Sequence, residues 1–456
     1  MNATPKDDPT AHGTPGAAVN TANTDTATAT ANGSLDTCTI LGDRSRGDGC
    51  PGAIRMHKAS DGYIGRVRFP GGFLTASDWE KLAATAATFG DGDIHMTTRG
   101  NVQIRGVRDQ EGLSAHLAGL GWIPSPDHDK MRNIITEPLD PAWAPWARRL
   151  DEKLRAQPAV APLSGRTLFG LDGGFGQVTR FAPDFGLQRA ADSTGANSSA
   201  PTGEHAVHLV LAGTVYQPTV TLDEALDSIV AMATLWAEIR GPHWRVKEHP
   251  DAHPELLAAA GLKHATPLNP TAPGHNRRPV GWFSAHTTEQ NSQEDTPQED
   301  TPTVSLGIGV PFGRISNEQA QLLAAIGHDT TVSPWPTITI HALTEGEAEA
   351  IVKVMAPRGF VFHDDSPQLR ITACTGQPGC DKSATDVRAD AHHLMNHPHL
   401  ITAHAADAYG DSQLPQPEDN NLLIHFSGCQ RRCGHPGATH LDYTATADGE
   451  YTTTVR

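Results

Sequence analysis

The sequence lacks the features that would place the chain in a membrane, on nucleic acid or in a disulfide-stapled scaffold. No apolar run approaches the roughly 18 residues that a membrane helix needs, and the N-terminus shows neither the basic nor the apolar region of a secretory signal. The net charge of −17 has no offsetting basic stretch, which argues against nucleic acid as a ligand. Aromatic residues are scarce and cysteines number only 6 in 456 residues. We therefore expect a cytoplasmic protein with no membrane or nucleic-acid partner.

The few cysteines are grouped rather than spread along the chain. Four of them form two close pairs with C-x5-C and C-x3-C spacing, at Cys374, Cys380, Cys429 and Cys433. Glycine and proline crowd both pairs, so the backbone can turn tightly around a bulky inorganic group. Cys38 and Cys50 stand apart, and a small buried thiol in a turn is the simpler interpretation of Cys50. Cysteines grouped in this way fit a reducing cytoplasm.

The two cysteine pairs favour an iron–sulfur cluster over the alternatives. Thiolates are soft ligands that suit iron–sulfur clusters and zinc. Zinc sites usually show C-x2-C or C-x4-C knuckles, which neither pair matches. Buried, inert cysteines are the other alternative, but four of them in two Gly/Pro-rich turns argue against it. We predict a [4Fe–4S] cluster with four cysteine ligands.

The same motifs carry a family resemblance. The phrase ACTGQPGC at 373–380, followed by FSGCQRRCGHP at 426–436, resembles the cluster motif of the siroheme sulfite and nitrite reductase superfamily. Within it, the match is closest to the precorrin-3B synthase family of aerobic cobalamin synthesis, and Pro279-Val-Gly-Trp282 resembles a short phrase of that family. The resemblance extends over roughly residues 48 to 445.

An internal repeat predicts the fold class. Residues 63–69 alternate like a strand, Ser77 and Glu80 form a capping box for a helix, and residues 94–105 form the next strand. The same order recurs at 304–310, at the capping box of Ser316 and Gln319, and at 331–340. By resemblance, the fold is α+β: two ferredoxin-like half-domains related by an internal repeat, each followed by a larger α+β segment, as in sulfite and nitrite reductases.

Composition and pattern divide the chain into six parts. Thr221 with Glu224 and Thr344 with Glu347 are predicted to cap two further helices, and residues 421–426 to form a strand before the second cysteine pair. The expected parts are a disordered tail (1–45), the first half-domain (46–125), the first reductase-like α+β domain (126–286), an acidic linker (287–303), the second half-domain (304–362) and the iron–sulfur cluster domain (363–456).

Basic residues in the first half-domain and after it are the candidates for substrate binding. Arginine binds carboxylates through two parallel hydrogen bonds, and tetrapyrroles of the uroporphyrin type carry acetate and propionate arms. The alternative is a set of solvated arginines on an exposed sheet face. Even spacing along one strand should put Arg99, Gln103 and Arg105 on one face. The candidates are Arg66, Arg68, Arg99, Gln103, Arg105, Arg132 and Arg166.

Two departures from the superfamily pattern bear on function. The lysine phrase of the reductases reads Arg166-Thr167-Leu168 here, so a positive charge that would hold a small anion is missing. Trp335 and Pro336 stand where the first repeat has Arg99 and Gly100, so the second half-domain is predicted to serve as scaffold.

The resemblance implies an oxygen-dependent monooxygenase that converts precorrin-3A to precorrin-3B by C20 hydroxylation with γ-lactone formation. It implies a [4Fe–4S] cluster, a mononuclear non-haem iron, O2 and an electron donor such as NADH or a reductase or ferredoxin. Among the 24 histidines, His57, His95, His425 and His435 are iron-ligand candidates that spacing cannot rank. One alternative is a siroheme-dependent sulfite or nitrite reductase. Another is a non-catalytic tetrapyrrole-binding iron–sulfur protein.

Overall fold

The computed structural model describes residues 48–190, 201–268, 278–284, 303–397, 423–436 and 439–456. The predicted tail and the predicted linker apart from its last residue lie outside these ranges. So does most of the stretch 191–203, whose polar, low-complexity sequence predicts a surface loop. Among the described residues, no helix combines the length and the apolar character that crossing a membrane would require. The described helices are α1 (Ala76–Phe89), α2 (Gln110–Gly119), α3 (Ala144–Arg155), α4 (Leu222–Ile239), α5 (His253–Ala259), α6 (Asn317–Ile326), α7 (Glu345–Met355) and α8 (Val387–Asn396).

Two five-stranded sheets form the repeated half-domains, and each borrows a strand from the other. The first sheet runs β1–β2–β5–β4–β14 and the second runs β12–β13–β16–β15–β3. The short strand that follows each Pro-containing turn, β3 or β14, pairs with the opposite sheet: Leu74 with Thr330, and Ile315 with Ile94. The bounds are β1 (His57–Lys58), β2 (Tyr63–Val67), β3 (Phe73–Leu74), β4 (Ile94–Met96), β5 (Val102–Val107), β12 (Gly281–Ser284), β13 (Val304–Gly309), β14 (Arg314–Ile315), β15 (Thr330–Val332) and β16 (Thr337–Leu343).

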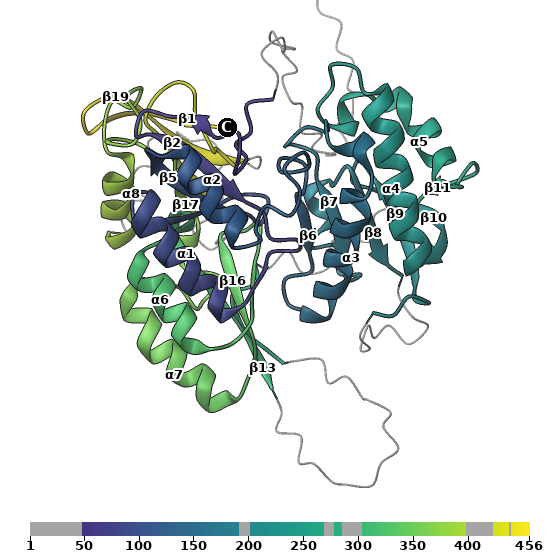
Figure 1. Ribbon diagram of the computed structural model, residues 1–456. Coiled ribbons are helices and arrows are strands. Elements are labelled where there is room, and N and C mark those ends of the chain that lie inside the picture. Colours follow the sequence, from purple (N-terminus) through teal and green to yellow (C-terminus); the bar gives the residue numbers. More distant parts are fainter. Residues whose placement is uncertain (1–47, 191–200, 269–277, 285–302, 398–422, 437–438) are drawn as a thin grey trace, which may run out of the picture. The chain divides into compact units, whose positions relative to one another are not determined.

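The reciprocal strand exchange confirms the predicted internal repeat and the α+β fold class. It also shows why the two halves depend on one another, because each sheet is completed only by the other half's chain. In Figure 1 the helices α1, α6 and α7 lie beside the half-domain strands, and α1 packs against α6.

The long strand predicted at 94–105 is wrong, because the chain turns back within it. β4 and β5 form an antiparallel hairpin, and the turn is closed by backbone hydrogen bonds from Thr97 N to Asn101 O (2.9 Å) and from Gly100 N to Thr97 O (3.1 Å). Gly100 has φ +63°, a conformation that glycine adopts without strain. The segment 331–340 is likewise a hairpin of β15 and β16. Arg99 therefore lies in a turn and does not share a strand face with Gln103 and Arg105.

The capping box predicted at Ser77 and Glu80 is also wrong. The N-cap of α1 is Thr75, whose hydroxyl accepts from Asp78 N while the Asp78 carboxylate accepts from Thr75 N. The borrowed strand β3 ends at Leu74, so the helix begins two residues earlier than predicted. The capping boxes predicted for α4, α6 and α7 are confirmed.

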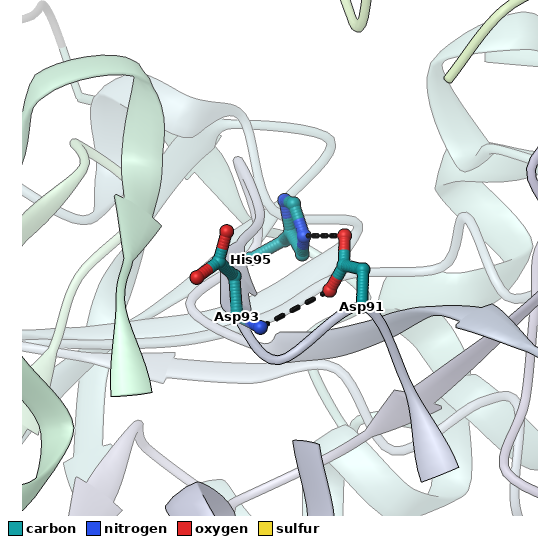
Figure 2. Close-up of side chains that lie close together, drawn as sticks. All are labelled: Asp91, Asp93 and His95. Carbon is teal, nitrogen blue, oxygen red and sulfur yellow. Dashed lines mark hydrogen bonds and ion pairs between the residues drawn. The ribbon is translucent and has the colours of Figure 1, made fainter. Parts of the chain in front are cut away.

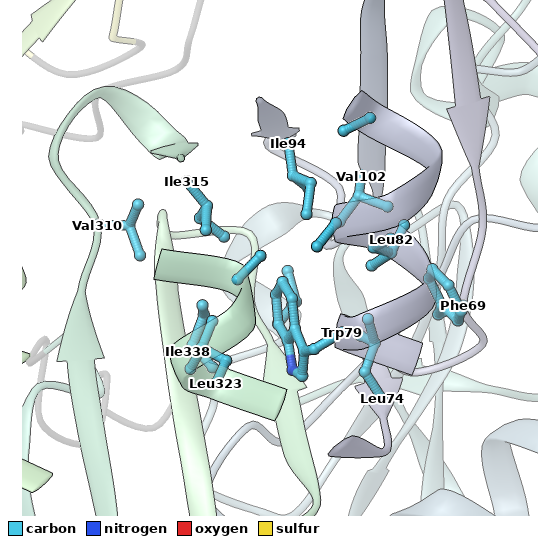
Figure 3. Packing of buried hydrophobic residues seen from close by; sticks show 14 of the residues in the cluster. Phe69, Leu74, Trp79, Leu82, Ile94, Val102, Val310, Ile315, Leu323 and Ile338 are labelled. Carbon is cyan, nitrogen blue, oxygen red and sulfur yellow. The ribbon is translucent and has the colours of Figure 1, made fainter. Parts of the chain in front are cut away.

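One hydrophobic core joins the two half-domains. Trp79 of α1 is fully buried, and its indole N–H donates to the Thr330 hydroxyl at 2.9 Å. Figure 3 shows its ring among Leu74 and Leu82 of the first half and Leu323 and Ile338 of the second. The packing explains why the repeated elements fold as a pair.

The segment after the first half-domain forms a six-stranded mixed sheet in the order β11–β10–β9–β8–β7–β6, in which β6, β7 and β8 are parallel. Helices α3 and α4 pack on it around Trp143 and Trp236, two fully buried rings. The strands are β6 (Ile134–Thr136), β7 (Phe169–Asp172), β8 (Phe185–Arg189), β9 (Ala206–Leu211), β10 (Thr214–Thr221) and β11 (Thr266–Pro267).

The last segment forms a four-stranded sheet, β17–β18–β19–β20, which positions the cysteine pairs. β17 (Ile371–Ala373), β18 (Leu423–Ser427) and β19 (His440–Ala447) are parallel, and β20 (Glu450–Val455) is antiparallel to β19. Helix α8 packs on β17 and β18. The predicted strand before the second cysteine pair is confirmed as β18.

The buried carboxyl group that follows β6, Glu137, is unfavourable in its charged form. Glu137 is 1% exposed, and no side chain among the described residues donates a hydrogen bond to its carboxylate, although the nearby Leu139 N–H favours the charged form. Burial raises the pKa of Glu137 well above its ordinary value, and Asp172 and Asp140 push it in the same direction. The folded protein therefore holds this side chain protonated at a pH where the unfolded chain does not.

We expect Glu137→Gln to stabilise the fold at neutral pH. Below the ordinary pKa of 4.5 the carboxyl is protonated in both states and costs nothing. Above it the unfolded chain loses its proton first, so the wild type loses stability as pH rises. The melting temperature of the variant should exceed that of the wild type by a few degrees, on the order of 1–2 kcal/mol, at about pH 7.5. This difference in melting temperature should shrink to nothing as the pH falls toward about 4.5. Glu152→Gln, at an exposed position of α3, is the matched control, and an equal gap at every pH would contradict the prediction.

Candidate active site

The four paired cysteines emerge from one edge of the last sheet. Cys374 follows β17 directly, and Cys429 follows β18 after one glycine. Because the two strands are parallel neighbours, their carboxyl ends lie at the same edge. The Gly428 N–H donates to Cys374 Sγ at 3.2 Å, and a Cβ at Gly428 would collide with Ser383. The sheet thus brings the C-x5-C and C-x3-C turns together.

The thiols are free and share one electrostatic neighbourhood. Cys374, Cys380, Cys429 and Cys433 are all outside disulfides, and Cys433 is exposed. Burial raises the pKa of the Cys374 thiol, opposed by the N–H of Gly428 and reinforced by the nearby Cys433 and Cys380. Soft thiolate donors in two tight turns, with a backbone N–H directed at one sulfur, fit an iron–sulfur cluster.

Arg66 and Gln103 face each other across strands β2 and β5. Their backbones are paired in the sheet. With the amide oriented so that its oxygen faces the guanidinium, Gln103 accepts from Arg66 Nε at 3.0 Å and Nη2 at 2.5 Å. The pairing fixes the Arg66 side chain, which also interacts with Cys50 and Asp48.

Three other predicted arginines are engaged by the protein itself. Arg132 is 4% exposed and binds Asp151 of α3 through Nε (2.5 Å) and Nη2 (3.2 Å). Arg105 binds Asp61 through Nε (3.1 Å) and Nη2 (2.9 Å). Arg68 donates to Asn133 at 3.1 Å and to the Pro51 carbonyl at 3.2 Å. Partners of this kind give each arginine a positioning role beside any role in binding.

Arg99 and Arg166 lie among several arginines whose positive charges repel one another. The Arg99 Nε is buried and has no hydrogen-bond partner among the described residues. Burial lowers the pKa of Arg99 to about 10; Arg245 adds most to this among the neighbouring charges, followed by Arg66 and Arg166, while Cys50 acts in the opposite sense. The Arg166 guanidinium lies over the Trp244 ring at 4.5 Å. An anion beside this group would relieve the repulsion.

A cavity of about 520 Å3 joins the basic wall to the cysteines. Its lining comes from the first half-domain, from the turn before β14 and from the cysteine-bearing segment. The residues that matter chemically are Arg66, Gln103, Arg105, Phe312, Cys374 and Cys433. A volume of this size suits a small-molecule ligand. The cavity therefore brings part of each predicted group together, across about 300 residues of sequence. Of the predicted substrate-binding residues, those outside its lining are Arg68, Arg99, Arg132 and Arg166.

Phe312 is a cavity residue that sequence reasoning missed. It has φ +57°, which is uncommon for a residue other than glycine, and it occupies the position that Gly71 holds in the first repeat. Its ring packs edge-on against His392 at 4.8 Å between centroids. The sequence did hold a signal for this residue, because the second copy of the repeated turn has phenylalanine where the first copy has glycine.

The described residues do not supply the ligand set expected for a mononuclear non-haem iron. Only one group of three ligand atoms comes together in the described chain: Asp91, Asp93 and His95 (Figure 2). His95 Nε2 is taken by Asp91 at 2.9 Å, and Asp93 is ion-paired with Arg314. This is one histidine with two engaged carboxylates rather than two histidines with one carboxylate. We assign no iron ligand.

The other candidate histidines fall in two places: His57 is at the cavity with His95, and His425 is near His435 and His440 beside the second cysteine pair. His57 joins His95 in lining the cavity. His425 is fully buried on β18, where Nδ1 lies 2.8 Å from the Thr372 hydroxyl, and burial lowers its pKa to about 4. His435 is exposed in the turn after Cys433.

The fold is of the type found in sulfite and nitrite reductases. Residues 56–112 match the nitrite/sulfite reductase ferredoxin-like half domain family. The fold resembles that of the Mycobacterium tuberculosis NirA protein, with a TM-score of 0.60 and 15% identity over 86% of this chain and 73% of that chain.

Sequence similarity narrows the resemblance to particular enzymes. A precorrin-3B synthase from Sinorhizobium sp is 24% identical over 426 residues, which are 88% of this chain and 81% of that protein. The sulfite reductase [NADPH] hemoprotein beta-component of Myxococcus xanthus (strain DK1622) is 22% identical over 443 residues, 85% of this chain and 75% of that protein. The resemblance to precorrin-3B synthase within this superfamily is confirmed, and the relatives are enzymes.

Proposed function

We propose that the chain is an oxygen-dependent monooxygenase that hydroxylates precorrin-3A at C20 and closes a γ-lactone from the ring A acetate, giving precorrin-3B. The observation that carries the proposal is the cavity that sets Arg66, Gln103 and Arg105 opposite Cys374 and Cys433. A polycarboxylate tetrapyrrole needs a basic wall, and a redox reaction needs an electron source beside it. The cavity offers residues for both.

The chain's own residues hold and orient the substrate. Arg66, fixed by Gln103, donates charge-assisted hydrogen bonds to one carboxylate arm. Arg99 and Arg166 do not line this cavity, but Arg99 interacts electrostatically with Arg66 and Arg166, so the two arginines add positive charge to its surroundings. Arg105 lines the cavity with Asp61 as its partner, whereas Arg68 and Arg132 keep their protein partners outside the lining.

The four cysteines hold the [4Fe–4S] cluster, which supplies electrons when it is bound. Oxygen provides the hydroxyl oxygen, and its second atom leaves as water at the expense of reducing equivalents from NADH or from a reductase or ferredoxin. The reduced thiols suit this activity to the cytoplasm.

A siroheme-dependent sulfite or nitrite reductase is the competing function, supported by the sulfite reductase relative. One position of the reductase phrase weighs against it. Arg166 keeps the first positive charge, but Leu168 stands where the second lysine of the phrase would be, is 4% exposed and packs with Ile135 and Val178. The cation that would hold a small anion is absent there, while the arginines suited to large carboxylates are present.

Anaerobic purification followed by absorption spectroscopy, iron analysis and turnover tests the proposal. We expect a cluster spectrum without the intense chlorin band of siroheme, and conversion of precorrin-3A to a product one oxygen heavier only when O2 and a reductant are supplied. Reduction of sulfite with a siroheme band would establish the competing function instead. An intact cluster with no turnover of the precorrin would indicate a binding protein.

A further inference from the structure

Arg388 is a cavity residue that no motif identifies. It lies in the first turn of α8, soon after Cys380, and its side chain lines both the 520 Å3 cavity and an adjoining cleft of about 990 Å3. Its Nε is buried and has no hydrogen-bond partner within the described residues. None of the ion pairs found among those residues includes its guanidinium.

The neighbouring carboxylates are already occupied. Arg314 is paired with Asp93, Arg105 with Asp61, and Asp91 with His95. Arg388 is therefore left half-buried beside two other cations and without a direct ion-pair partner among the described residues. Burial, with Arg314 and then Arg105, lowers its pKa, while Cys374 and Asp91 act in the opposite sense. A partly desolvated cation without a direct partner is costly, which favours a bound anion at this position.

The position of Arg388 points to the substrate as that anion. Arg66 and Gln103 lie on the wall built by the first half-domain, whereas Arg388 comes from the cysteine-bearing segment and interacts electrostatically with Cys374. We propose that Arg388 binds a carboxylate arm of the tetrapyrrole from the cluster side of the cavity, so that the macrocycle is held between two basic walls. This inference rests on the proposed function and adds the second wall to it.

Binding of sirohydrochlorin, a stable polycarboxylate tetrapyrrole, to the cluster-loaded protein tests the inference by fluorescence quenching. We expect Arg388→Gln to weaken binding about tenfold to a hundredfold, as for loss of one charge-assisted contact, and Arg388→Lys to recover part of it. Arg358→Gln is the matched control, because Arg358 lines the same outer cleft but is held by Glu318 at 3.3 Å and by the Val354 carbonyl at 2.7 Å. The Arg358→Gln variant should bind sirohydrochlorin as tightly as the wild type. With methyl-esterified sirohydrochlorin, Arg388→Gln and the wild type should bind equally.

Thermal stability separates a binding role from a structural one. Removing a half-buried cation that has no direct ion-pair partner should leave the melting temperature of the ligand-free protein unchanged or raise it, whereas loss of a structural arginine would lower it. The role of Arg388 would be overturned if Arg388→Gln bound sirohydrochlorin as tightly as the wild type. It would also be overturned if a lowered melting temperature of the variant accounted for its weaker binding. Both outcomes would leave the proposed function intact. Failure of the wild type itself to bind sirohydrochlorin would remove the proposed function and this inference together.

Discussion

Replacing Cys374 by serine is expected to abolish the iron–sulfur cluster, with loss of most of the bound iron and sulfide. The hydroxyl is a hard, weakly acidic donor that replaces a soft thiolate poorly. The position is also the one where the Gly428 N–H reaches the sulfur, so the substitution removes a ligand and the hydrogen bond that tunes it. Cys380→Ser, Cys429→Ser and Cys433→Ser should act in the same way, because all four thiols belong to the two turns at one sheet edge.

Cys50→Ser is the matched control for this prediction. Cys50 is a free thiol in a part-buried turn, where its N–H donates to Asp48 at 3.0 Å and its electrostatic partners are Asp48, Arg66 and Arg99 rather than the other cysteines. The iron and sulfide content of the Cys50→Ser variant should match that of the wild type. Retention of the cluster in Cys374→Ser with loss in Cys50→Ser would contradict the ligand assignment. The measurements are chemical iron and sulfide analysis and the visible absorption of anaerobically purified protein.

The sequence predicted the features that depend on local pattern. The capping boxes of α4, α6 and α7 follow from side chains three residues apart, and the repeat follows from the order of strand, turn and helix. Prediction from the sequence failed where two local signals competed. The alternation at 94–105 continues through Thr97 to Asn101, but Gly100 adopts a positive φ that permits a hairpin. Pairing of β5 with β2 and of β4 with β14 stabilises this hairpin.

Long-range pairing explains what sequence reasoning could not reach in the site. The spacing of the cysteines predicts a metal site because the two members of each pair are close in the chain. The arginines could not be sorted in the same way, since Arg132 finds its carboxylate 19 residues away and Arg105 finds one 44 residues away. Arg388 is distinguished only by lacking such a partner among the described residues, a property that no single-sequence pattern expresses.

Trp79→Ala is expected to destabilise both half-domains at once, by about 3–5 kcal/mol. Trp79 is fully buried between the two repeats, and its N–H bonds to Thr330 of the second one (Figure 3). Removing the ring leaves a cavity that neither half can close alone, because β3 and β14 tie each half to the sheet of the other. Trp79→Phe keeps most of the ring volume and leaves Thr330 its bond to the Leu74 carbonyl at 3.2 Å, so it should cost less.

Trp282→Ala provides the control, since this tryptophan is 45% exposed on the edge strand β12 and should change stability by only about 0.5 kcal/mol. Urea unfolding of the three variants gives the energies, and limited proteolysis during unfolding shows which segments open. Cleavage in both half-domains at the same urea concentration in Trp79→Ala is the expected result. If residues 304–362 stayed protected while the first half-domain was digested, the repeats would be separate folding units, and the exchange of strands would not couple their stability.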